Sequence, residues 1–150
     1  MEITVRKLQE DDIEALSRIE AASFSMPWSA EAFRDLLLRP YCTYLVAVAE
    51  GKVVGCCGYT DICNEANIDN VVVDPAYRNR GVGKAMMGEL LKTGRAAGVK
   101  AYTLEVRVSN HAAIHLYENF GFQSEGIRPN FYEKPTEDAN IMWLREKNIK

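Results

Sequence analysis

The sequence predicts a single α/β domain over residues 1–150, built on a central sheet with helices around it. Two observations support this fold class. Segments in which apolar residues recur at helical spacing are interspersed with segments in which apolar and polar residues alternate, as strands do. The chain has 150 residues, of which 47% are hydrophobic, and contains no repeat, low-complexity tract or linker. A chain of this size buries roughly two-thirds of its unfolded surface, which is enough for one core.

The first 40 residues predict one strand and two helices. The strand is residues 3–8, which alternate as an edge strand does, and the first helix is residues 10–24. Acidic residues at the start of this helix interact favourably with the helix dipole. The second helix, residues 29–38, begins at Ser29, a residue type that caps helices, and Pro40 lies just beyond its end.

Strands and helices follow one another in the rest of the chain. Residues 44–62 are typical of a hairpin that turns at Glu50 and Gly51. Helices are predicted at 83–97 and 110–120, because apolar residues recur there at helical spacing and a glycine follows each segment. Alternation predicts further strands, at residues 66–75, 101–108, 122–132 and 140–146.

Charge and hydropathy exclude two classes of partner. The chain carries 18 basic and 21 acidic residues, a net charge of -3, which argues against a nucleic-acid binder because such affinity needs clustered Lys and Arg. No apolar run reaches the roughly 18 residues of a membrane span, and the first residues lack the basic-then-apolar order of a signal peptide. We therefore expect a soluble cytoplasmic protein.

Neither the cysteines nor the histidines predict a metal site. The four cysteines, at positions 42, 56, 57 and 63, match neither a paired zinc-binding spacing nor a secreted disulfide framework, so reduced structural thiols are expected. His111 and His115 are four residues apart and could share one helix face. Their segment lacks the glutamate of the zinc protease motif, and no third ligand is evident.

The stretch RNRGVGK, residues 78–84, places two arginines and two glycines between a strand and a helix. It is no nucleoside triphosphate loop, because Lys84 is followed by Ala85 and no glycine lies five residues before Gly83. It is no dinucleotide fingerprint, because Met86 stands where the third glycine is needed. Free N–H groups at a helix N-terminus nevertheless bind anions, and glycines let a phosphate approach closely. The stretch predicts a pyrophosphate site or an ordinary glycine-rich turn.

The longer stretch VVVDPAYRNRGVGKAMM resembles motif A of the GNAT N-acetyltransferase superfamily, whose R/Q-x-x-G-x-G/A signature matches Arg78, Gly81 and Gly83. In that superfamily the loop holds the pyrophosphate of acetyl-CoA, and the preceding strand offers backbone groups to the pantetheine arm. The resemblance covers nearly the whole chain and implies a mixed, mostly antiparallel sheet flanked by helices. The cofactor-binding residues that it implies are Val71, Val72, Val73, Arg78, Asn79, Arg80, Gly81, Val82, Gly83, Lys84 and Asn110.

Within the superfamily, LEVRVSN followed by AIHLYENFGF, with MPWS near the start and RPNFY near the end, is most similar to the ribosomal-protein-alanine N-acetyltransferases of the RimI type. That resemblance implies transfer to the N-terminal α-amine of a small-subunit ribosomal protein. It implies Glu105 as the general base and Tyr117 as the general acid. His111 and His115 depart from the usual alanine-rich pattern and bring titratable groups near the cofactor helix.

The residues themselves leave alternatives to both roles. Alternation places Glu105 on the same strand face as Arg107, so it is also a candidate surface carboxylate. Tyr117 lies among apolar residues of a helix, as a core aromatic does. Asp69 is a rival base, because several members of the superfamily use a carboxylate from the strand that leads into the loop.

The acceptor is less defined by the sequence. An α-ammonium has a pKa near 7.7 to 8.0, whereas a lysine ammonium has a pKa near 10.4. A lysine acceptor is therefore harder to deprotonate by about 2.5 pKa units. Trp28 and Tyr132 lie in connecting segments and are expected either to contact the acceptor or to pack as rim aromatics. The alternatives are acetylation of lysine or small amines, a non-catalytic acyl-CoA-binding module, and a structural protein. The presence of both Glu105 and Tyr117 argues against the module.

Overall fold

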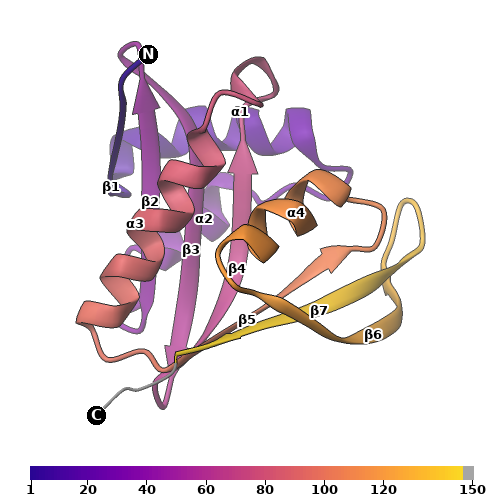
Figure 1. The fold of residues 1–150 in the computed structure, drawn as a ribbon. Helices are drawn as coiled ribbons and strands as arrows, with labels where there is room; N and C mark the ends of the chain where they lie inside the picture. Colours follow the sequence, from indigo (N-terminus) through magenta and orange to yellow (C-terminus); the bar gives the residue numbers. More distant parts are fainter. Residues whose placement is uncertain (147–150) are drawn as a thin grey trace.

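A seven-stranded sheet forms the centre of the structure, a computed structural model in which residues 1–146 are described (Figure 1). Its order is β1-β2-β3-β4-β5-β7-β6, and each neighbouring pair is antiparallel except β4 and β5. The predicted mixed, mostly antiparallel sheet is therefore confirmed. The strands are β1 (Ile3–Lys7), β2 (Cys42–Ala49), β3 (Lys52–Ile62), β4 (Glu65–Val73), β5 (Ala101–Arg107), β6 (Gln123–Tyr132) and β7 (Glu137–Arg145).

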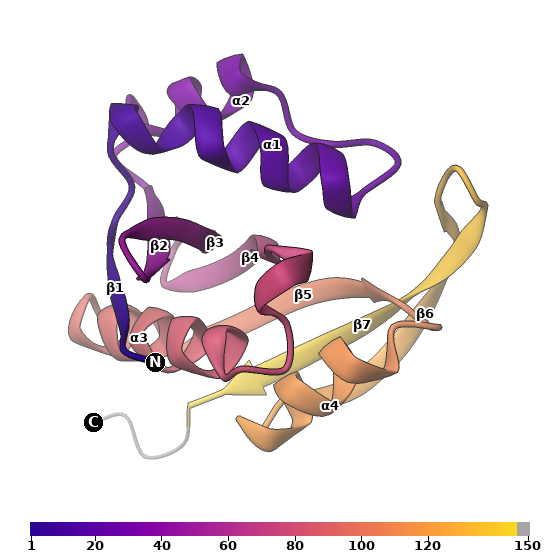
Figure 2. The same cartoon turned by 90° about the horizontal axis from the view of Figure 1, so that it is seen from above.

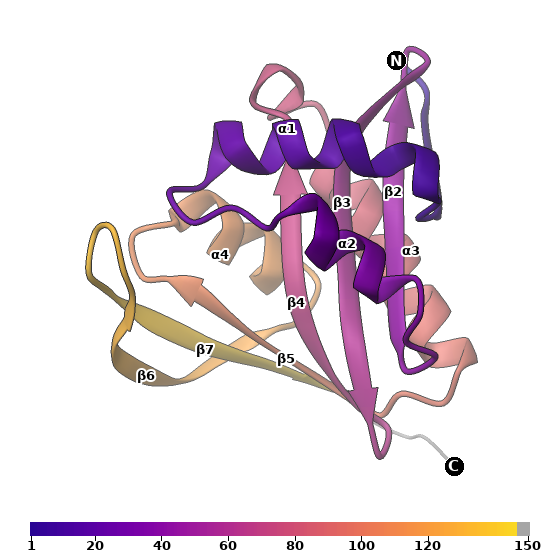
Figure 3. The same cartoon turned by 180° about the vertical axis from the view of Figure 1, so that it is seen from behind.

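Helices cover both faces of the sheet. Helices α1 and α2 lie on one face, and α3 and α4 lie on the other (Figure 2). The view from behind shows α1 crossing in front of β2, β3 and β4 (Figure 3). Within residues 1–146, no helix is long and apolar enough to cross a membrane. The helices are α1 (Ile13–Ser23), α2 (Ala30–Leu36), α3 (Val82–Ala96) and α4 (His111–Asn119), with short 3-10 turns η1 (Glu10–Asp12) and η2 (Pro75–Tyr77).

Local sequence signals explain where most of these elements begin and end. The Ser29 hydroxyl accepts the N–H of Ala32 at 3.1 Å and caps α2, as predicted. Gly98 and Gly121 follow α3 and α4 with φ of 90° and 100°. This left-handed conformation ends a helix at little cost only in glycine, which has no Cβ.

Helix α1 starts later than its sequence pattern predicts. It begins at Ile13 rather than Glu10, and the preceding turn is η1. The Asp12 carboxylate accepts the Gln9 N–H at 2.8 Å and forms two hydrogen bonds of 2.9 Å with the Arg6 guanidinium. This turn is therefore tied to β1 by an ion pair that local periodicity does not reveal.

Each face of the sheet buries its own core. Strand β3 supplies both cores from adjacent residues, because successive side chains of a strand point to opposite faces. Cys57 packs in the core under α3 and α4, and Cys56 packs in the core under α1 and α2. The largest apolar side chains of the two cores include Met86, Leu90, Tyr102 and Phe122 in the first and Leu16, Ile19, Phe33 and Tyr44 in the second.

Strands β4 and β5 separate soon after they pair. Among the described residues, their parallel pairing covers only residues 65–67 of β4 and 101–103 of β5. Figure 1 shows the two strands diverging from this point. The remainder of β4, up to Val73, keeps its pairing with β3. Its other edge therefore presents backbone groups that are not used by β5, in an opening between the two halves of the sheet.

A β-bulge interrupts β4 inside this opening. Gly58 of β3 pairs with Asn70 and Tyr59 pairs with Ile68, so Asp69 has no partner on β3. A bulge inserts one extra residue and changes the direction of the side chains that follow. The adjacent side chains of Asp69 and Asn70 consequently both lie on the α1 and α2 side of the sheet.

Candidate active site

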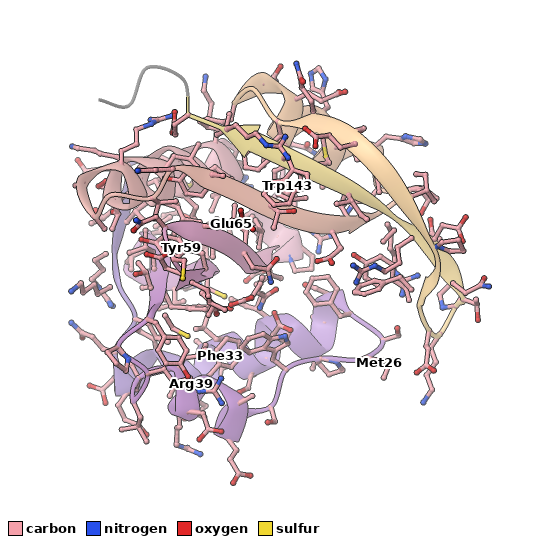
Figure 4. All side chains as sticks on the ribbon, turned by 90° about the horizontal axis from the view of Figure 1, so that it is seen from below. Met26, Phe33, Arg39, Tyr59, Glu65 and Trp143 are labelled. Atoms are coloured by element: carbon pink, nitrogen blue, oxygen red, sulfur yellow. The ribbon has the colours of Figure 1, made fainter. Side chains whose placement is uncertain are left out.

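A cleft of about 410 Å³ opens on the α1 and α2 side of the sheet, where β4 and β5 diverge. We call it the central cleft. It brings together the connection before α2, the end of α2, and strands β3, β4, β5 and β6. Figure 4 shows Phe33 and Arg39 in the layer of α1 and α2, and Trp143 on the side of β5 and β7. The cleft is lined by Trp28, Leu36, Arg39, Thr60, Asn67, Ile68, Asp69, Glu105, Phe131 and Tyr132.

Glu105 reaches the central cleft from β5. Its side chain is 24% exposed, and its Oε2 lies 3.3 Å from Nη1 of Arg128 on β6. Arg107 is not its partner, although it is close in sequence: Arg107 contacts Glu137 at 3.2 Å and lies over the ring of Tyr132. Glu105 is thus a partly buried carboxylate with one ion pair and a free approach from the cleft.

Asp69 lies at about the same level of the sheet as Glu105. Asn67 pairs with Thr103, and each carboxylate is two residues beyond its member of that pair. The Thr60 hydroxyl donates to Asp69 Oδ2 at 2.7 Å, and the Asn67 amide donates to Oδ1 at 2.9 Å. Burial raises the pKa of Asp69, and these two donors partly oppose that rise. The structure therefore brings both candidate bases to one cleft.

Two aromatic residues named from the sequence also line the cleft: Trp28 lies in a connecting segment, as predicted, whereas Tyr132 is the last residue of strand β6. The Trp28 ring packs against Phe33 and Tyr44, with centroid distances of 5.4 and 5.9 Å. Tyr132 lies under the Arg107 guanidinium, 4.5 Å from its ring centroid. Burial, followed by the nearby charge of Glu105, raises the pKa of Tyr132 to about 12. The phenol of Tyr132 therefore stays neutral and able to donate at physiological pH.

Tyr117 lies on the opposite side of the sheet from the central cleft. It is a buried residue of α4 and packs against Phe122 with a centroid distance of 5.9 Å. Burial raises its pKa, with smaller contributions from Cys57 and Tyr132. The structure does not place Tyr117 in contact with Glu105. A ligand that passes between β4 and β5 is needed to approach both.

The 78–84 loop presents backbone N–H groups at the start of α3. The first hydrogen bond of the helix runs from the Ala85 N–H to the Gly81 carbonyl at 3.0 Å. The N–H groups of Val82, Gly83 and Lys84 therefore lie outside the helical ladder and are available to an anion. Gly81 caps this end with a φ of 85°, a conformation that places the chain tightly around the helix start.

The basic side chains of this loop differ in their contacts. Arg78 donates to the Val73 carbonyl at 3.3 Å and to the Ser23 hydroxyl at 3.2 Å, so it ties α1 to the end of β4. The Arg80 guanidinium lies 5.4 Å from the ring centroid of Tyr77. Positive charge therefore surrounds the N-terminus of α3, and the Arg78 side chain also has a structural contact.

Asn110 directly precedes α4 and the two histidines lie on it, and none of the three lines the central cleft. The Asn110 side chain accepts the Ala113 N–H at 3.2 Å and caps the helix. His111 and His115 are both exposed. In the part of the chain that the structure describes, no group of three His, Cys, Asp or Glu residues is arranged to hold a metal ion.

Sequence reasoning missed two charged residues near this site. Arg128, on β6, lies 23 positions from Glu105, and no local pattern connects them. Glu20 is fully buried on α1. A sequence signal for its burial exists, because Ile13, Leu16 and Glu20 have the spacing i, i+3, i+7. This spacing places the Glu20 carboxylate on the apolar face of the helix.

The chain is similar to proteins that are named as acetyltransferases. The chain is 39% identical over 141 residues to a Bacillus subtilis protein that is provisionally named a ribosomal protein bS18-alanine N-acetyltransferase. The match covers 93% of each protein. It is 36% identical over 145 residues to the ribosomal protein bS18-alanine N-acetyltransferase of Escherichia coli, covering 94% of this chain and 96% of that protein. A crystal structure of the Escherichia coli ribosomal-protein-alanine N-acetyltransferase superposes with a TM-score of 0.88 at 32% identity, covering 99% of both chains.

The Acetyltransferase (GNAT) family profile matches residues 13–122, well over half of the chain. This match includes β4, the 78–84 loop, β5 and α4. With the identities above, it shows that the chain belongs to the acetyltransferase (GNAT) family.

Proposed function

We propose that this enzyme transfers the acetyl group of acetyl-CoA to the N-terminal α-amine of a protein, and that the acceptor is a ribosomal protein that begins with alanine. The relatives named above as ribosomal protein bS18-alanine N-acetyltransferases support this acceptor. The observation that carries the proposal is the opening between β4 and β5, which leads from the 78–84 loop to a cleft that contains a carboxylate.

Acetyl-CoA is proposed to bind along this opening. The unpaired edge of β4 at Val71, Val72 and Val73 offers backbone groups to the pantetheine arm. The N–H groups at the start of α3 would receive the pyrophosphate, and the positive charge of the 78–84 loop adds to their attraction. Asn110, at the start of α4, would then lie beside the same ligand.

Glu105 is proposed to act as the general base. At neutral pH most of an α-amine is protonated, with a pKa near 7.7 to 8.0, and must lose a proton before it can attack. Glu105 accepts that proton, directly or through one water, from the cleft side. The amine nitrogen then forms a bond to the thioester carbon, and the carbon–sulfur bond breaks.

Tyr117 is proposed to act as the general acid. The departing thiolate needs a proton, and a phenol on the α4 side of the opening can supply it. Burial raises the pKa of Tyr117, so the phenol carries its proton at working pH. Glu105 and Tyr117 would therefore serve the two ends of the reaction from opposite sides of the sheet.

Asp69 is the second candidate base, because it faces the same cleft at the level of Glu105. Its two oxygens already accept hydrogen bonds from Thr60 and Asn67, and these fix its position. Within residues 1–146, Glu105 has no such pair of neutral donors, and its ion pair is with the exposed Arg128. This difference in contacts supports Glu105 as the base and Asp69 as a fixed wall of the cleft.

Acetylation of matched peptides tests the proposed function. A peptide with a free N-terminal alanine is expected to be acetylated in an assay of thiol release, with mass spectrometry locating the acetyl group. The same peptide with its α-amine blocked and an internal lysine available should be a poor substrate. Equal use of both peptides would contradict the α-amine acceptor and leave the acetyltransferase activity. Heat of acetyl-CoA binding without any turnover would indicate a non-catalytic module instead.

Substitution of Gly81 by valine tests the proposed pyrophosphate site. A Cβ at this φ of 85° strains the backbone and stands in the path of an approaching phosphate. We expect acetyl-CoA affinity, measured by calorimetry, to fall by roughly tenfold or more, since a charge-assisted hydrogen bond contributes about 1.5 to 3 kcal/mol.

The matched control is Gly98→Val, which introduces similar strain at a φ of 90° at the opposite end of α3. This variant should lose comparable thermal stability and keep its affinity for acetyl-CoA. Equal affinities for Gly81→Val, Gly98→Val and the parent would exclude the 78–84 loop as the pyrophosphate site.

A further inference from the structure

Glu20 is a carboxylate with no exposed surface, held near the end of α1. Its Oε1 accepts the backbone N–H of Trp28 at 3.0 Å, and its Oε2 accepts the side-chain amide of Asn70 at 2.8 Å. Burial raises the pKa of Glu20, and both donors oppose that rise. A buried polar group of this kind is costly unless its partners are in place, so both contacts constrain the segments that make them.

The two partners of Glu20 lie in different parts of the fold, Trp28 in the connection before α2 and Asn70 on β4. Trp28 lines the central cleft, and its ring rests on Phe33 and Tyr44. Asn70 follows the bulge of β4 and directly precedes the edge proposed for acetyl-CoA. The carboxylate therefore joins the wall of the cleft to the strand between the two proposed substrate sites.

The chain around Trp28 depends on this contact because it has little regular structure. Residues 24–29 lie between α1 and α2 and form neither helix nor strand. Phe24 and Met26 in this segment are 42% and 56% exposed, so they contribute little burial that could hold it. Besides the packing of the Trp28 ring, the hydrogen bond from the Trp28 N–H to the buried carboxylate fixes the backbone of this connection.

A second contact links the same end of α1 to the same strand. Arg78 donates to the Ser23 hydroxyl and to the Val73 carbonyl. Ser23 is one turn beyond Glu20, and Val73 is three residues beyond Asn70. The last turn of α1 is thus attached to β4 at two levels, and Glu20 forms the buried attachment.

We infer that Glu20 is a positioning residue for the acceptor. It holds the Trp28 wall of the central cleft at a fixed distance from β4, so that an acceptor peptide meets the acetyl group in the correct place. This inference rests on the proposed function, because it assigns the central cleft to the acceptor. Glu20 itself has no path to either substrate, since its side chain is fully enclosed.

Three variants separate positioning from general stability. Glu20→Met has a similar length and removes both acceptors, so the KM for the acceptor peptide should rise about tenfold. Its Kd for acetyl-CoA, measured by calorimetry, should change less than about twofold. Glu20→Gln should stay close to the parent, because its amide oxygen accepts the Trp28 N–H and its NH₂ can donate to a rotated Asn70 amide. Glu14→Met, on the same helix with a side chain 90% exposed, is the matched control.

Either of two results with Glu20→Met would overturn the inference. An unchanged acceptor KM in Glu20→Met, or an equal loss of acceptor and acetyl-CoA binding, would leave Glu20 with a purely structural role. If Glu20→Met does not fold, Asn70→Ala decides the question. This variant keeps the hydrogen bond between Glu20 and Trp28 and removes the one between Glu20 and β4. An unchanged KM for the acceptor peptide in Asn70→Ala would overturn the inference. If the parent prefers a lysine peptide, the α-amine proposal fails and the same comparison with that peptide tests Glu20.

Discussion

The Glu105→Gln variant is expected to bind acetyl-CoA normally and to acetylate an alanine-initiated peptide about 10²- to 10⁴-fold more slowly at pH 7. Glutamine keeps nearly the same volume and removes the group that accepts the proton. The 78–84 loop and the β4 edge, where acetyl-CoA is proposed to bind, are untouched by this change. Steady-state kinetics measure the loss of rate, and calorimetry measures the affinity for acetyl-CoA.

The loss in Glu105→Gln should shrink as the pH rises. Above the α-amine pKa of about 8 the nucleophile is already free, so a missing base costs less. A pH profile of kcat/KM for parent and variant should therefore converge at alkaline pH. Profiles that stay parallel would show that the carboxylate does not act as the base.

Two further variants test whether Glu105 is the base. Arg128→Gln breaks the ion pair with Glu105 but keeps the carboxylate, and since the arginine is 54% exposed the activity should fall by less than about tenfold. Asp69→Asn tests the rival base in the same cleft. Full activity of Glu105→Gln at pH 7, together with a large loss in Asp69→Asn, would transfer the role to Asp69.

The Tyr117→Phe variant is expected to lower kcat by roughly 10²-fold or more, with little change in acetyl-CoA affinity. The ring keeps its packing against Phe122, and only the phenolic hydroxyl is lost. Because burial raises the pKa of Tyr117, the parent phenol stays protonated through neutral and mildly alkaline pH. Rates at saturating acetyl-CoA between pH 6 and 9 measure the effect on chemistry.

Folding stability gives Tyr117→Phe a second, independent signature. A phenol whose pKa is raised on folding stabilises the fold below its unfolded pKa of about 10, and this contribution is lost as the pH rises further. The phenylalanine variant lacks that component, so its melting temperature should fall less between pH 9 and 11 than that of the parent.

The control for Tyr117→Phe is Tyr102→Phe, which removes another buried phenol from the same core. The Tyr102 hydroxyl donates to the Leu91 carbonyl at 3.2 Å, so this variant should lose some stability and keep its kcat. A Tyr117→Phe enzyme as fast as the parent at every pH would leave Tyr117 as a core residue only.

Local interactions determined most of the element positions, and these could be predicted from the sequence. Ser29 caps α2 with a contact three residues away, and Gly98 ends α3 through its own backbone conformation. The alternation that puts Glu105 and Arg107 on one face of β5 agrees with the burial of Tyr102, Leu104 and Val106 on the other. Each of these signals acts within a few residues, so the order of residues alone contains it.

The family resemblance named residues that the local patterns could not rank. It favoured a pyrophosphate site over an ordinary glycine-rich turn at residues 78–84, and it selected Glu105 from among 21 acidic residues. The structure then placed Glu105 and Asp69 in one cleft with Trp28 and Tyr132. Their catalytic and binding roles remain predictions for the experiments above.

Only the tertiary structure decided how these residues are arranged. The bulge at Asp69 arises from pairing between β3 and β4, and the ion pair of Glu105 with Arg128 joins β5 to β6. Glu20 has its partners 8 and 50 residues away. Such contacts depend on which strands become neighbours and on which side chains the packed layers exclude from water. The sequence therefore determined where helices and strands form, whereas the opening between β4 and β5 and the burial of Glu20 exist only once the sheet and its helices have come together.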